Sequence, residues 1–161
     1  MKKVNINDID KEPWQSPGGK FAACFRGISE ALGRDPQSLD LAKRHPFDLE
    51  ITRIPPGKIN FPYHAHSAQW ELYLVMSGRG TVRHKHGETE VTAGDAFIFR
   101  PNEPHQIRNP ARDDLVYYVI ADNPIGDSGY FPASGKWKVN KLSDKRVDIK
   151  GRETDYFDGE E

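Results

Sequence analysis

Apolar and polar residues alternate through the middle of the chain in short runs that are bounded by glycine and proline. Alternation with a period of two is typical of strands that bury one face of a sheet. The pattern predicts strands at residues 47–54, 71–76, 81–92 (a hairpin), 95–100, 105–109 and 114–121. Many short strands with regular turns indicate an all-β fold, a small antiparallel barrel or jelly roll.

The two ends of the chain differ from the middle in their sequence pattern. Before the strands, the sequence predicts a strand at 3–7, a short helix or strand-turn that ends at Gly33, and a short helix at 38–44. After the strands, a turn-rich stretch leads into a basic and then an acidic run. We find no internal repeat. We therefore expect one domain: an N-terminal extension (1–45) that packs on a barrel (46–122), and a C-terminal extension (123–161).

Composition limits the function classes. A chain of 161 residues can bury a real core, and its net charge of −1 argues against general binding to nucleic acid or to anionic membranes. No apolar run approaches the roughly 20 residues of a membrane helix. The N-terminal residues lack the apolar segment of a secretory signal. Cys24 is the single cysteine, which suits a reducing compartment, so we expect a cytoplasmic protein.

Three histidines and a glutamate are the candidate metal ligands. His64 and His66 are two residues apart, so on a strand they would project from the same face. Glu71 opens the next strand after a turn, and His105 opens a later one. Three imidazoles and one carboxylate without a thiolate favour one divalent ion among Mn, Fe, Co, Ni and Zn. Such a set leaves one or two coordination positions for exchangeable ligands.

These four residues also fall within two spaced motifs. The first motif has a glycine, the H-x-H pair, a glutamate after four further residues and a glycine after six more; its members are Gly57, His64, His66, Glu71 and Gly78. The second motif has a glycine, a turn, a histidine and an asparagine; its members are Gly94, Pro101, His105 and Asn109.

Both motifs, in this order, resemble those of the cupin superfamily. The resemblance covers roughly residues 45–122 and departs from the family pattern at two positions. Arg100 stands where proline is usual, and Asn102 stands where glycine is usual. Asparagine tolerates a left-handed backbone better than most residues, so the turn at Asn102 can still form.

The resemblance implies a cupin-type double-stranded β-helix with one barrel, and a divalent metal held by the four residues above. Cupins include dioxygenases, decarboxylases, sugar and sugar-phosphate isomerases and plain binding proteins, so the fold alone does not choose an activity. We expect a metal-binding cupin that binds or transforms a small polar metabolite, such as a carboxylate, sugar or sugar phosphate. The alternatives are an Fe(II)-dependent dioxygenase and a non-catalytic binding or sensor barrel.

Further residues are candidates for the pocket. By alternation Tyr73 shares the face of Glu71, where it would orient a substrate or transfer a proton; a core tyrosine with a satisfied hydroxyl is the other reading. Arg53 would anchor an anionic substrate, and Gln69 flanks the ligands. A second H-x-H pair, His84 and His86, falls at a hairpin tip, where we expect water to surround it.

Open barrels of this kind have edge strands to cover. Pairing with a second subunit is a common solution, so we predict a homodimer.

Overall fold

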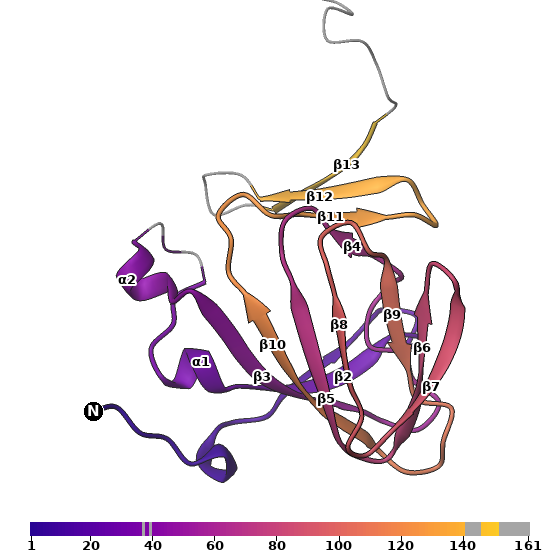
Figure 1. The fold of residues 1–161 in the computed structure, drawn as a ribbon, viewed down its shortest axis with the longest axis horizontal. Coiled ribbons are helices and arrows are strands. Elements are labelled where there is room, and N and C mark those ends of the chain that lie inside the picture. Colours follow the sequence, from indigo (N-terminus) through magenta and orange to yellow (C-terminus); the bar gives the residue numbers. More distant parts are fainter. Residues whose placement is uncertain (37, 39, 141–145, 152–161) are drawn as a thin grey trace, which may run out of the picture.

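The computed structural model describes residues 1–36, 38, 40–140 and 146–151. These residues form three antiparallel sheets that curve into a barrel (Figure 1). The largest sheet has the strand order β1-β2-β3-β10-β5-β8, the second has β13-β12-β11-β4, and the third has β7-β6-β9. The all-β expectation is confirmed.

The strands of the large sheet are β1 (Glu12–Gln15), β2 (Ala22–Gly27), β3 (Phe47–Ile54), β10 (Leu115–Asp122), β5 (Glu71–Ser77) and β8 (Ala96–Phe99). Those of the second sheet are β4 (Ala65–His66), β11 (Ser128–Phe131), β12 (Lys136–Asn140) and β13 (Arg146–Lys150). The third sheet contains β6 (Arg79–His84), β7 (Gly87–Thr92) and β9 (His105–Arg108).

The barrel interior is filled by the inward residues of facing strands. Ile54, Val75, Ile107 and Leu115 are at most 2% exposed and form the centre of the core. Along β5 the burial alternates as the sequence predicts, with Tyr73 and Val75 buried and the residues between them exposed. Apolar burial of this kind, at roughly 25 cal/mol per Å², is the main force that holds the sheets together.

The glycine that ends the first motif is required by close packing. Gly78 has a φ of 79°, and a Cβ atom there would lie 2.2 Å from the carbonyl oxygen of Asp114. Only glycine accommodates both the left-handed backbone and this approach. The turn after β5 therefore fixes where β6 begins relative to β10.

The N-terminal region differs in part from the prediction. The strand expected at residues 3–7 is wrong: Ile6–Asp8 form a 3₁₀ turn, because the Asn5 side chain accepts a hydrogen bond from the Asn7 amide. The expected strand-turn is present as β2 followed by α1 (Ile28–Ala31). The helix expected at 38–44 is α2 (Leu41–Arg44), with Asp40 as its N-cap.

The chain after β10 folds back over the barrel. Strand β11 pairs with β4, and β12 and β13 extend the same sheet outward (Figure 1). Through this pairing, β11 lies next to the H-x-H segment. The division into extensions and barrel at residues 45 and 122 stays a prediction.

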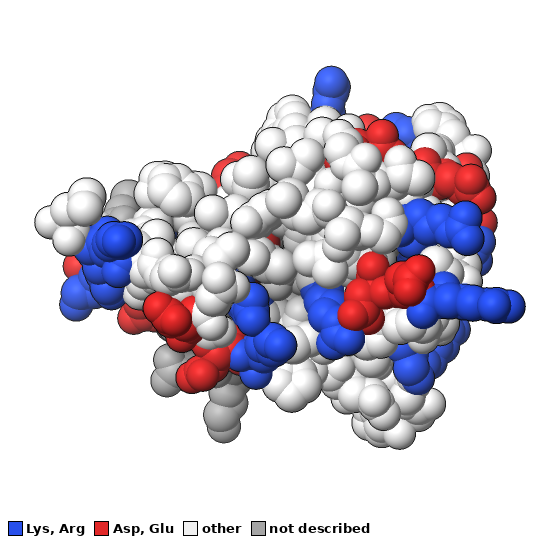
Figure 2. Space-filling view, turned by 90° about the horizontal axis from the view of Figure 1, so that it is seen from below, with Lys and Arg blue, Asp and Glu red and all other residues white. Residues whose placement is uncertain are grey.

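Two surface properties bear on partners. Viewed from one end of the barrel, acidic and basic side chains are interspersed and do not form one basic field (Figure 2). Within the described ranges, every helix is too short or too polar to span a bilayer.

Candidate metal centre

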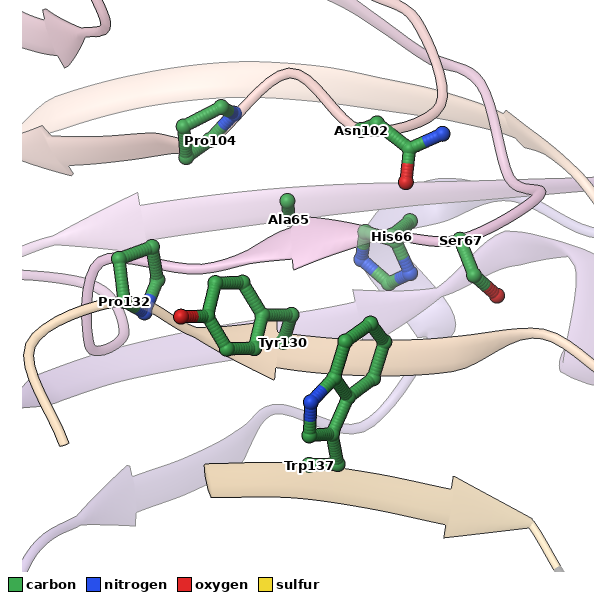
Figure 3. Close-up of a pocket in the computed structure, with 8 residues that line it drawn as sticks. All are labelled: Ala65, His66, Ser67, Asn102, Pro104, Tyr130, Pro132 and Trp137. Atoms are coloured by element: carbon green, nitrogen blue, oxygen red, sulfur yellow. The ribbon is translucent and has the colours of Figure 1, made fainter. Parts of the chain in front are cut away.

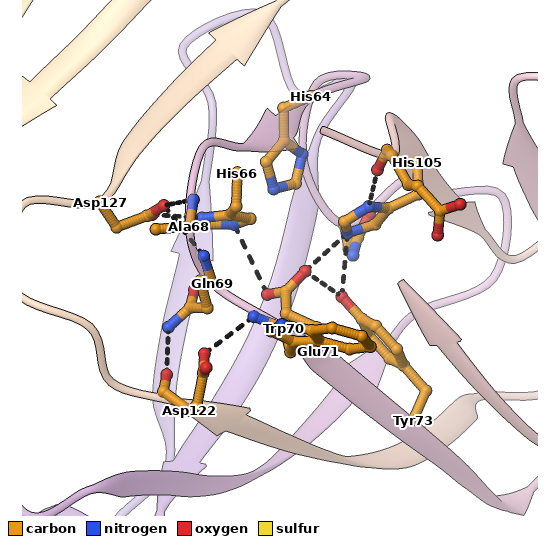
Figure 4. A network of polar contacts seen from close by, with 12 residues as sticks. His64, His66, Ala68, Gln69, Trp70, Glu71, Tyr73, His105, Asp122 and Asp127 are labelled. Atoms are coloured by element: carbon orange, nitrogen blue, oxygen red, sulfur yellow. Dashed lines mark hydrogen bonds and ion pairs between the residues drawn. The ribbon is translucent and has the colours of Figure 1, made fainter. Parts of the chain in front are cut away.

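Three strands bring the candidate ligands together. His66 belongs to β4, Glu71 opens β5 and His105 opens β9. His64 precedes β4 and is paired with His105 by two backbone hydrogen bonds, of 3.2 and 2.8 Å. The four side chains point toward one another inside the barrel (Figure 4).

The donor atoms are close enough to share one cation. The ligand atoms of His64, His66 and Glu71 all lie within 4.8 Å of one another. His105 joins them through Glu71, with its Nε2 2.7 Å from Oε2 of the carboxylate. His66 Nε2 is 3.6 Å from the other carboxylate oxygen. His64, His66 and Glu71 could hold a metal ion. Metal binding by His105, which contacts this group through Glu71, stays a prediction.

Each histidine is oriented by an acceptor outside the group. The Nδ1 atoms of His64 and His105 lie 2.8 Å and 3.1 Å from the backbone carbonyls of Pro62 and Glu103. His66 Nδ1 lies 2.6 Å from a carboxylate oxygen of Asp127. When Nδ1 carries the ring proton and donates it outward, the other ring nitrogen, Nε2, faces the centre. A histidine that binds a metal through Nε2 needs this tautomer. The residues present therefore fit a divalent ion.

The protonation states of His64 and Glu71 suit metal binding, since ligand donors must be deprotonated. Burial, assisted by the neighbouring His105, lowers the pKa of His64 to about 4. Burial alone would raise the pKa of Glu71, but the hydrogen bond from His105 and the nearby imidazoles outweigh it and lower this pKa to about 2. At neutral pH His64 is therefore neutral and Glu71 is ionised.

Asp127 belongs to the candidate site but was not predicted from the sequence. Its Oδ1 accepts hydrogen bonds from the amides of Ala68 and Gln69, at 2.8 and 3.2 Å. Its Oδ2 faces His66. Burial acts against the charge of His66, but the bond to Asp127 and the charge of Glu71 raise the pKa of this histidine above its usual value. Asp127 lies in a turn-rich stretch with no periodicity, so the sequence carried no signal for it.

Tyr73 lies beneath the carboxylate. Its hydroxyl donates to Glu71 Oε2 at 3.0 Å and is 3.2 Å from His105 Nε2. Burial, together with the charge of Glu71, raises the pKa of Tyr73 well above its usual value, so the phenol keeps its proton. The residue is thus adjacent to the ligand set; a catalytic role for it stays a prediction.

The other two predicted pocket residues point elsewhere. The side-chain amide of Gln69 donates through Nε2 to the backbone carbonyl oxygen of Asp122 at 2.7 Å. The exposed Arg53 places its Nε 2.6 Å from a carboxylate oxygen of Asp114. These contacts of both side chains lie outside the four-residue group, and substrate binding by either residue stays a prediction.

The second H-x-H pair lies at the tip of the β6–β7 hairpin, as predicted. His84 pairs with Gly87 across the turn, and His86 is exposed. The Nε2 of His84 is 3.0 Å from the hydroxyl of Thr89. This pair therefore offers a surface counterpart to His64 and His66 for mutational controls.

Both departures from the second motif are compatible with the site. Asn102 has a φ of 64° and takes the left-handed conformation that its position requires. Its amide donates to the His66 carbonyl at 2.7 Å, which ties the turn to β4. The Arg100 amide donates to the Glu103 carboxylate at 3.0 Å, a hydrogen bond that proline could not make.

Aromatic rings form the walls around the imidazoles. Phe99 stacks on His105 with ring centroids 4.1 Å apart and an interplanar angle of 7°. The ring centroids of Phe131 and His64 are 6.0 Å apart, and the ring of Phe61 contacts the His64 ring edge-on. An apolar wall limits the access of water and strengthens electrostatic interactions inside the site.

A cavity of about 160 Å³ adjoins the H-x-H segment (Figure 3). It lies between β4, the 102–104 turn and the β11–β12 hairpin, with Tyr130 and Trp137 among its lining residues. His66 and Asn102 also contribute to the lining. A cavity of this size suits only a very small molecule, because the pockets that bind drug-sized ligands have volumes of about 300–1,000 Å³.

Comparison with known proteins gives the family. Residues 50–121 match the family model of the cupin domain. The "oxalate-binding protein" of Thermotoga maritima is 26% identical over 68 residues, which is 42% of this chain and 55% of that protein. The chain therefore spans about half the length of this curated relative.

Solved structures share the fold. A sugar phosphate isomerase of the cupin superfamily from Silicibacter pomeroyi has a TM-score of 0.76 and 16% identity, with 92% of each chain covered. The polyketide cyclase RemF from Streptomyces resistomycificus has a TM-score of 0.59 and 22% identity, over 77% of this chain and 80% of that one. These likenesses confirm the double-stranded β-helix expected from the two motifs. Residues 50–121 of the chain thus form a single small cupin domain.

Proposed function

We propose that this cupin binds one divalent transition metal through His64, His66, Glu71 and His105, and that the metal centre binds or transforms a small polar metabolite. The observation that carries the proposal is the orientation of the three imidazoles. Each Nδ1 has an acceptor outside the group, so each Nε2 faces the centre, where the Nε2 atoms of His105 and His66 lie 2.7 and 3.6 Å from the Glu71 carboxylate. Strand rigidity then holds these donors in place.

The chemistry of the donors limits the metal. Imidazole and carboxylate ligands without a thiolate favour Mn, Fe, Co, Ni or Zn. When bound, such an ion acts as a Lewis acid for an oxygen ligand at its open positions. Within the chain, Asp127 holds the His66 ring, and Tyr73 donates to the Glu71 carboxylate and orients it. We propose that the Tyr73 phenol moves a proton at the bound ligand, because its hydroxyl lies beside Glu71 and His105.

The ligand class follows from what a metal with open positions can hold. Carboxylates, hydroxy-ketones and sugar hydroxyls all supply the oxygen atoms that such an ion binds. The relatives' names, an oxalate-binding protein and a sugar phosphate isomerase, refer to ligands of this kind. Arg53, the residue predicted to anchor an anionic group such as phosphate, forms an ion pair with Asp114 instead. We therefore favour a small carboxylate or hydroxy-carbonyl compound over a phosphorylated sugar.

One observation favours a second candidate, an Fe(II)-dependent dioxygenase. Phe61, Phe99 and Phe131 surround the imidazoles and make the site largely apolar. An apolar, water-poor pocket suits oxygen chemistry better than sugar isomerisation. A non-catalytic binding barrel would use the same ligands without turnover. Iron content together with oxygen uptake distinguishes the dioxygenase from the other two.

The test is metal content in matched variants. Protein is purified without chelator or nickel resin, and bound metals are measured by mass spectrometry for the wild type, His64→Ala/His105→Ala and His84→Ala/His86→Ala. We expect close to one metal per chain in the wild type and in the hairpin variant, and a loss of at least tenfold in the site variant. Thermal melts followed by circular dichroism check that all three proteins are folded.

Two results would contradict the metal proposal. One is a wild-type protein that contains no metal and binds no added Mn, Fe, Co or Zn. The other is equal metal loss in both double variants. If metal is present, the visible spectrum of the Co(II)-loaded protein is then titrated with oxalate and with a neutral hydroxy-ketone. A change with either probe supports an open coordination position, and no change with both argues against a ligand-binding centre.

Two further proposals complete the description. Cytoplasmic location rests on the single cysteine, Cys24. The homodimer rests on the edge strands of the barrel, which a second subunit would cover.

A further inference from the structure

Glu50 is an acidic side chain inside the barrel that has no part in the ligand set described above. The side chains of Thr52 and Ile54 on β3 are buried in the core, so Glu50 points inward by alternation. The Thr52 hydroxyl donates to the Glu50 carboxyl at 2.7 Å, which places the two side chains on one face. Within the described residues this is the only hydrogen bond of the carboxyl, and no lysine or arginine forms an ion pair with it.

The strand register places Glu50 across β10 from the candidate ligands. Strands β3, β10 and β5 are neighbours in the large sheet (Figure 1). Glu50 pairs with Val119 on β10, and Val119 pairs with Tyr73 on β5. In the next inward row, Ala121 pairs with Glu71. Neighbouring strands are about 4.8 Å apart, so the backbones at Glu50 and Tyr73 are on the order of 10 Å apart. Glu50 therefore faces the same interior as the candidate metal ligands, two strands away.

The inward residues of β10 between Glu50 and Glu71 have small side chains. They are Val119, which is partly buried, and Ala121, which is 6% exposed. Water reaches the residues on both sides of them, because the Glu71 and His66 side chains are 13% and 19% exposed and Glu50 is also partly exposed. No bulky side chain of β10 therefore separates Glu50 from the candidate metal centre.

The surroundings of Glu50 are unfavourable for a negative charge. In its row, β2 contributes Gly27, which has no side chain. Arg34 is engaged by Asp48 at 3.0 Å. The titratable groups that act on Glu50 are other acids and two phenols that keep their protons: Asp48 on β3, Glu71 on β5, Glu30 on α1, Tyr73 on β5 and Tyr117 on β10. Burial, together with the charges of these acids, raises the pKa of Glu50 to about 7. An acid that lowers stability and has no cation partner points to a role beyond packing.

We propose that Glu50 binds the end of the metabolite that does not coordinate the metal, through a hydrogen bond to a hydroxyl group of that end. This inference rests on the proposed function, because it takes the other end of the metabolite to occupy the open positions of the metal. Glu50 and the metal then hold one ligand between them above Val119 and Ala121. Glu50 is in this way a residue that determines which ligands bind, and it takes no part in holding the metal.

Length and charge define the class of ligand. Two strand spacings, about 10 Å, match a chain of about four carbons with one metal bond of about 2 Å and one hydrogen bond of about 2.8 Å. A hydroxyl suits Glu50 in both protonation states, because it donates to a carboxylate and accepts from a carboxylic acid. A second carboxylate at this end would meet the negative charges of Glu50 and Asp48. The class is therefore a short hydroxy acid or hydroxy-ketone whose hydroxyl lies far from the metal-bound group.

The test uses three ligands that differ only at the end in question. Butyrate, 4-hydroxybutyrate and succinate share a four-carbon chain and one carboxylate, and they end in a methyl group, a hydroxyl and a second carboxylate. Their affinities for the Co(II)-loaded protein are measured from the visible spectrum at pH 8. The proteins are the wild type, Glu50→Ala, Glu50→Gln and, as a matched control, Glu90→Gln at an exposed position on β7. Metal content and thermal melts are recorded for each protein.

The wild type and Glu90→Gln should bind 4-hydroxybutyrate at least tenfold more tightly than butyrate, since a hydrogen bond to a charged group is worth about this much. In Glu50→Ala the two affinities should agree within about threefold, because no hydrogen bond to the hydroxyl remains. Glu50→Gln should keep part of the preference, since its amide also bonds a hydroxyl, and it should bind succinate about tenfold more tightly than the wild type does. Metal content should be the same in all four proteins.

The outcomes separate this inference from the proposed function. A wild type that binds no metal, or whose spectrum none of the three ligands changes, contradicts the proposed function, and the inference falls with it. A metal centre that binds the ligands with the same preference in the wild type and in Glu50→Ala overturns the inference alone. Loss of metal in Glu50→Gln also overturns it, because Glu50 would then support the metal itself. If Glu50→Ala does not fold, equal succinate affinity in Glu50→Gln and the wild type is the result that overturns it.

Discussion

The Nδ1 of His66 lies 2.6 Å from the Oδ2 of Asp127, 61 positions later in the chain. The carboxylate is itself fixed by the amides of Ala68 and Gln69, in the turn that follows His66. A candidate metal ligand is therefore oriented by the segment after β10, which folds back over the barrel beside β4. This arrangement extends the functional site beyond residues 50–121, which match the family model.

Asp127→Asn should weaken metal binding ten- to one hundredfold. The carboxylate supplies a charge-assisted hydrogen bond to the His66 ring, and loss of such a support typically costs this much in affinity. Competition with a fluorescent chelator measures the affinity. Asp114→Asn is the control, since Asp114 forms an ion pair with Arg53 on the surface. Equal affinity in Asp127→Asn and Asp114→Asn would show that this bond does not support the metal.

Tyr73→Phe should keep the metal and lower stability. The change removes the hydroxyl that donates to Glu71 but leaves the 2.7 Å contact between Glu71 and His105. A lost buried hydrogen bond costs about 1 kcal/mol in the free energy of unfolding. Urea denaturation and metal analysis measure the two quantities. Tyr63→Phe, at a half-buried tyrosine whose ring packs on Arg83, serves as the control. A tenfold loss of metal in Tyr73→Phe would instead make the phenol part of the ligand set.

Substitutions at Asn102 should separate backbone strain from side-chain contacts. With a φ of 64°, alanine at this position should lower the free energy of unfolding by about 1 kcal/mol, whereas glycine should leave it within a few tenths. Urea denaturation of Asn102→Ala and Asn102→Gly measures the difference. Equal free energies of unfolding for Asn102→Ala and Asn102→Gly would contradict the need for a left-handed backbone at this position.

Glu50 should make stability depend on pH. Burial raises its pKa from a usual value near 4.5 to about 7, although Thr52 donates a hydrogen bond to it. Between pH 4.5 and pH 7 the Glu50 carboxyl is ionised in the unfolded chain but keeps its proton in the folded chain. The free energy of unfolding therefore falls as the pH rises through this range. Above pH 7 the penalty is constant, at most about 3 kcal/mol, and below pH 4.5 it is absent.

Glu50→Gln should remove this dependence. The variant should be more stable than the wild type at pH 8 and similar to it at pH 4, when unfolding by urea is compared across this range. Glu90→Gln, at an exposed position on β7, should follow the wild type at each pH. A constant difference between Glu50→Gln and the wild type over the whole range would contradict the raised pKa.

The sequence by itself determined most of the strands between residues 47 and 122 and the candidate ligands, but not β1, β4 or β11–β13. Alternation is a local property, since adjacent side chains on a strand point to opposite faces whatever the strand pairs with. It therefore identified β3, β5 and β10 and placed Tyr73 on the face of Glu71. The spacing of His64 and His66 gave their common direction, and the tolerance of asparagine for a left-handed backbone accounted for Asn102. Local rules were less reliable at the N-terminus, where the Asn5 side chain forms a cap and the expected strand is a 3₁₀ turn.

Only the tertiary structure decided which segments meet. It brought Asp127 to His66 by pairing β11 with β4, turned Gln69 toward Asp122, and engaged Arg53 with Asp114. It also aligned Glu50 with Val119 and Tyr73 in one inward row. The alternating pattern states which face a side chain occupies but not which strand lies beside it. That choice depends on contacts between residues far apart in the chain, which no local pattern encodes.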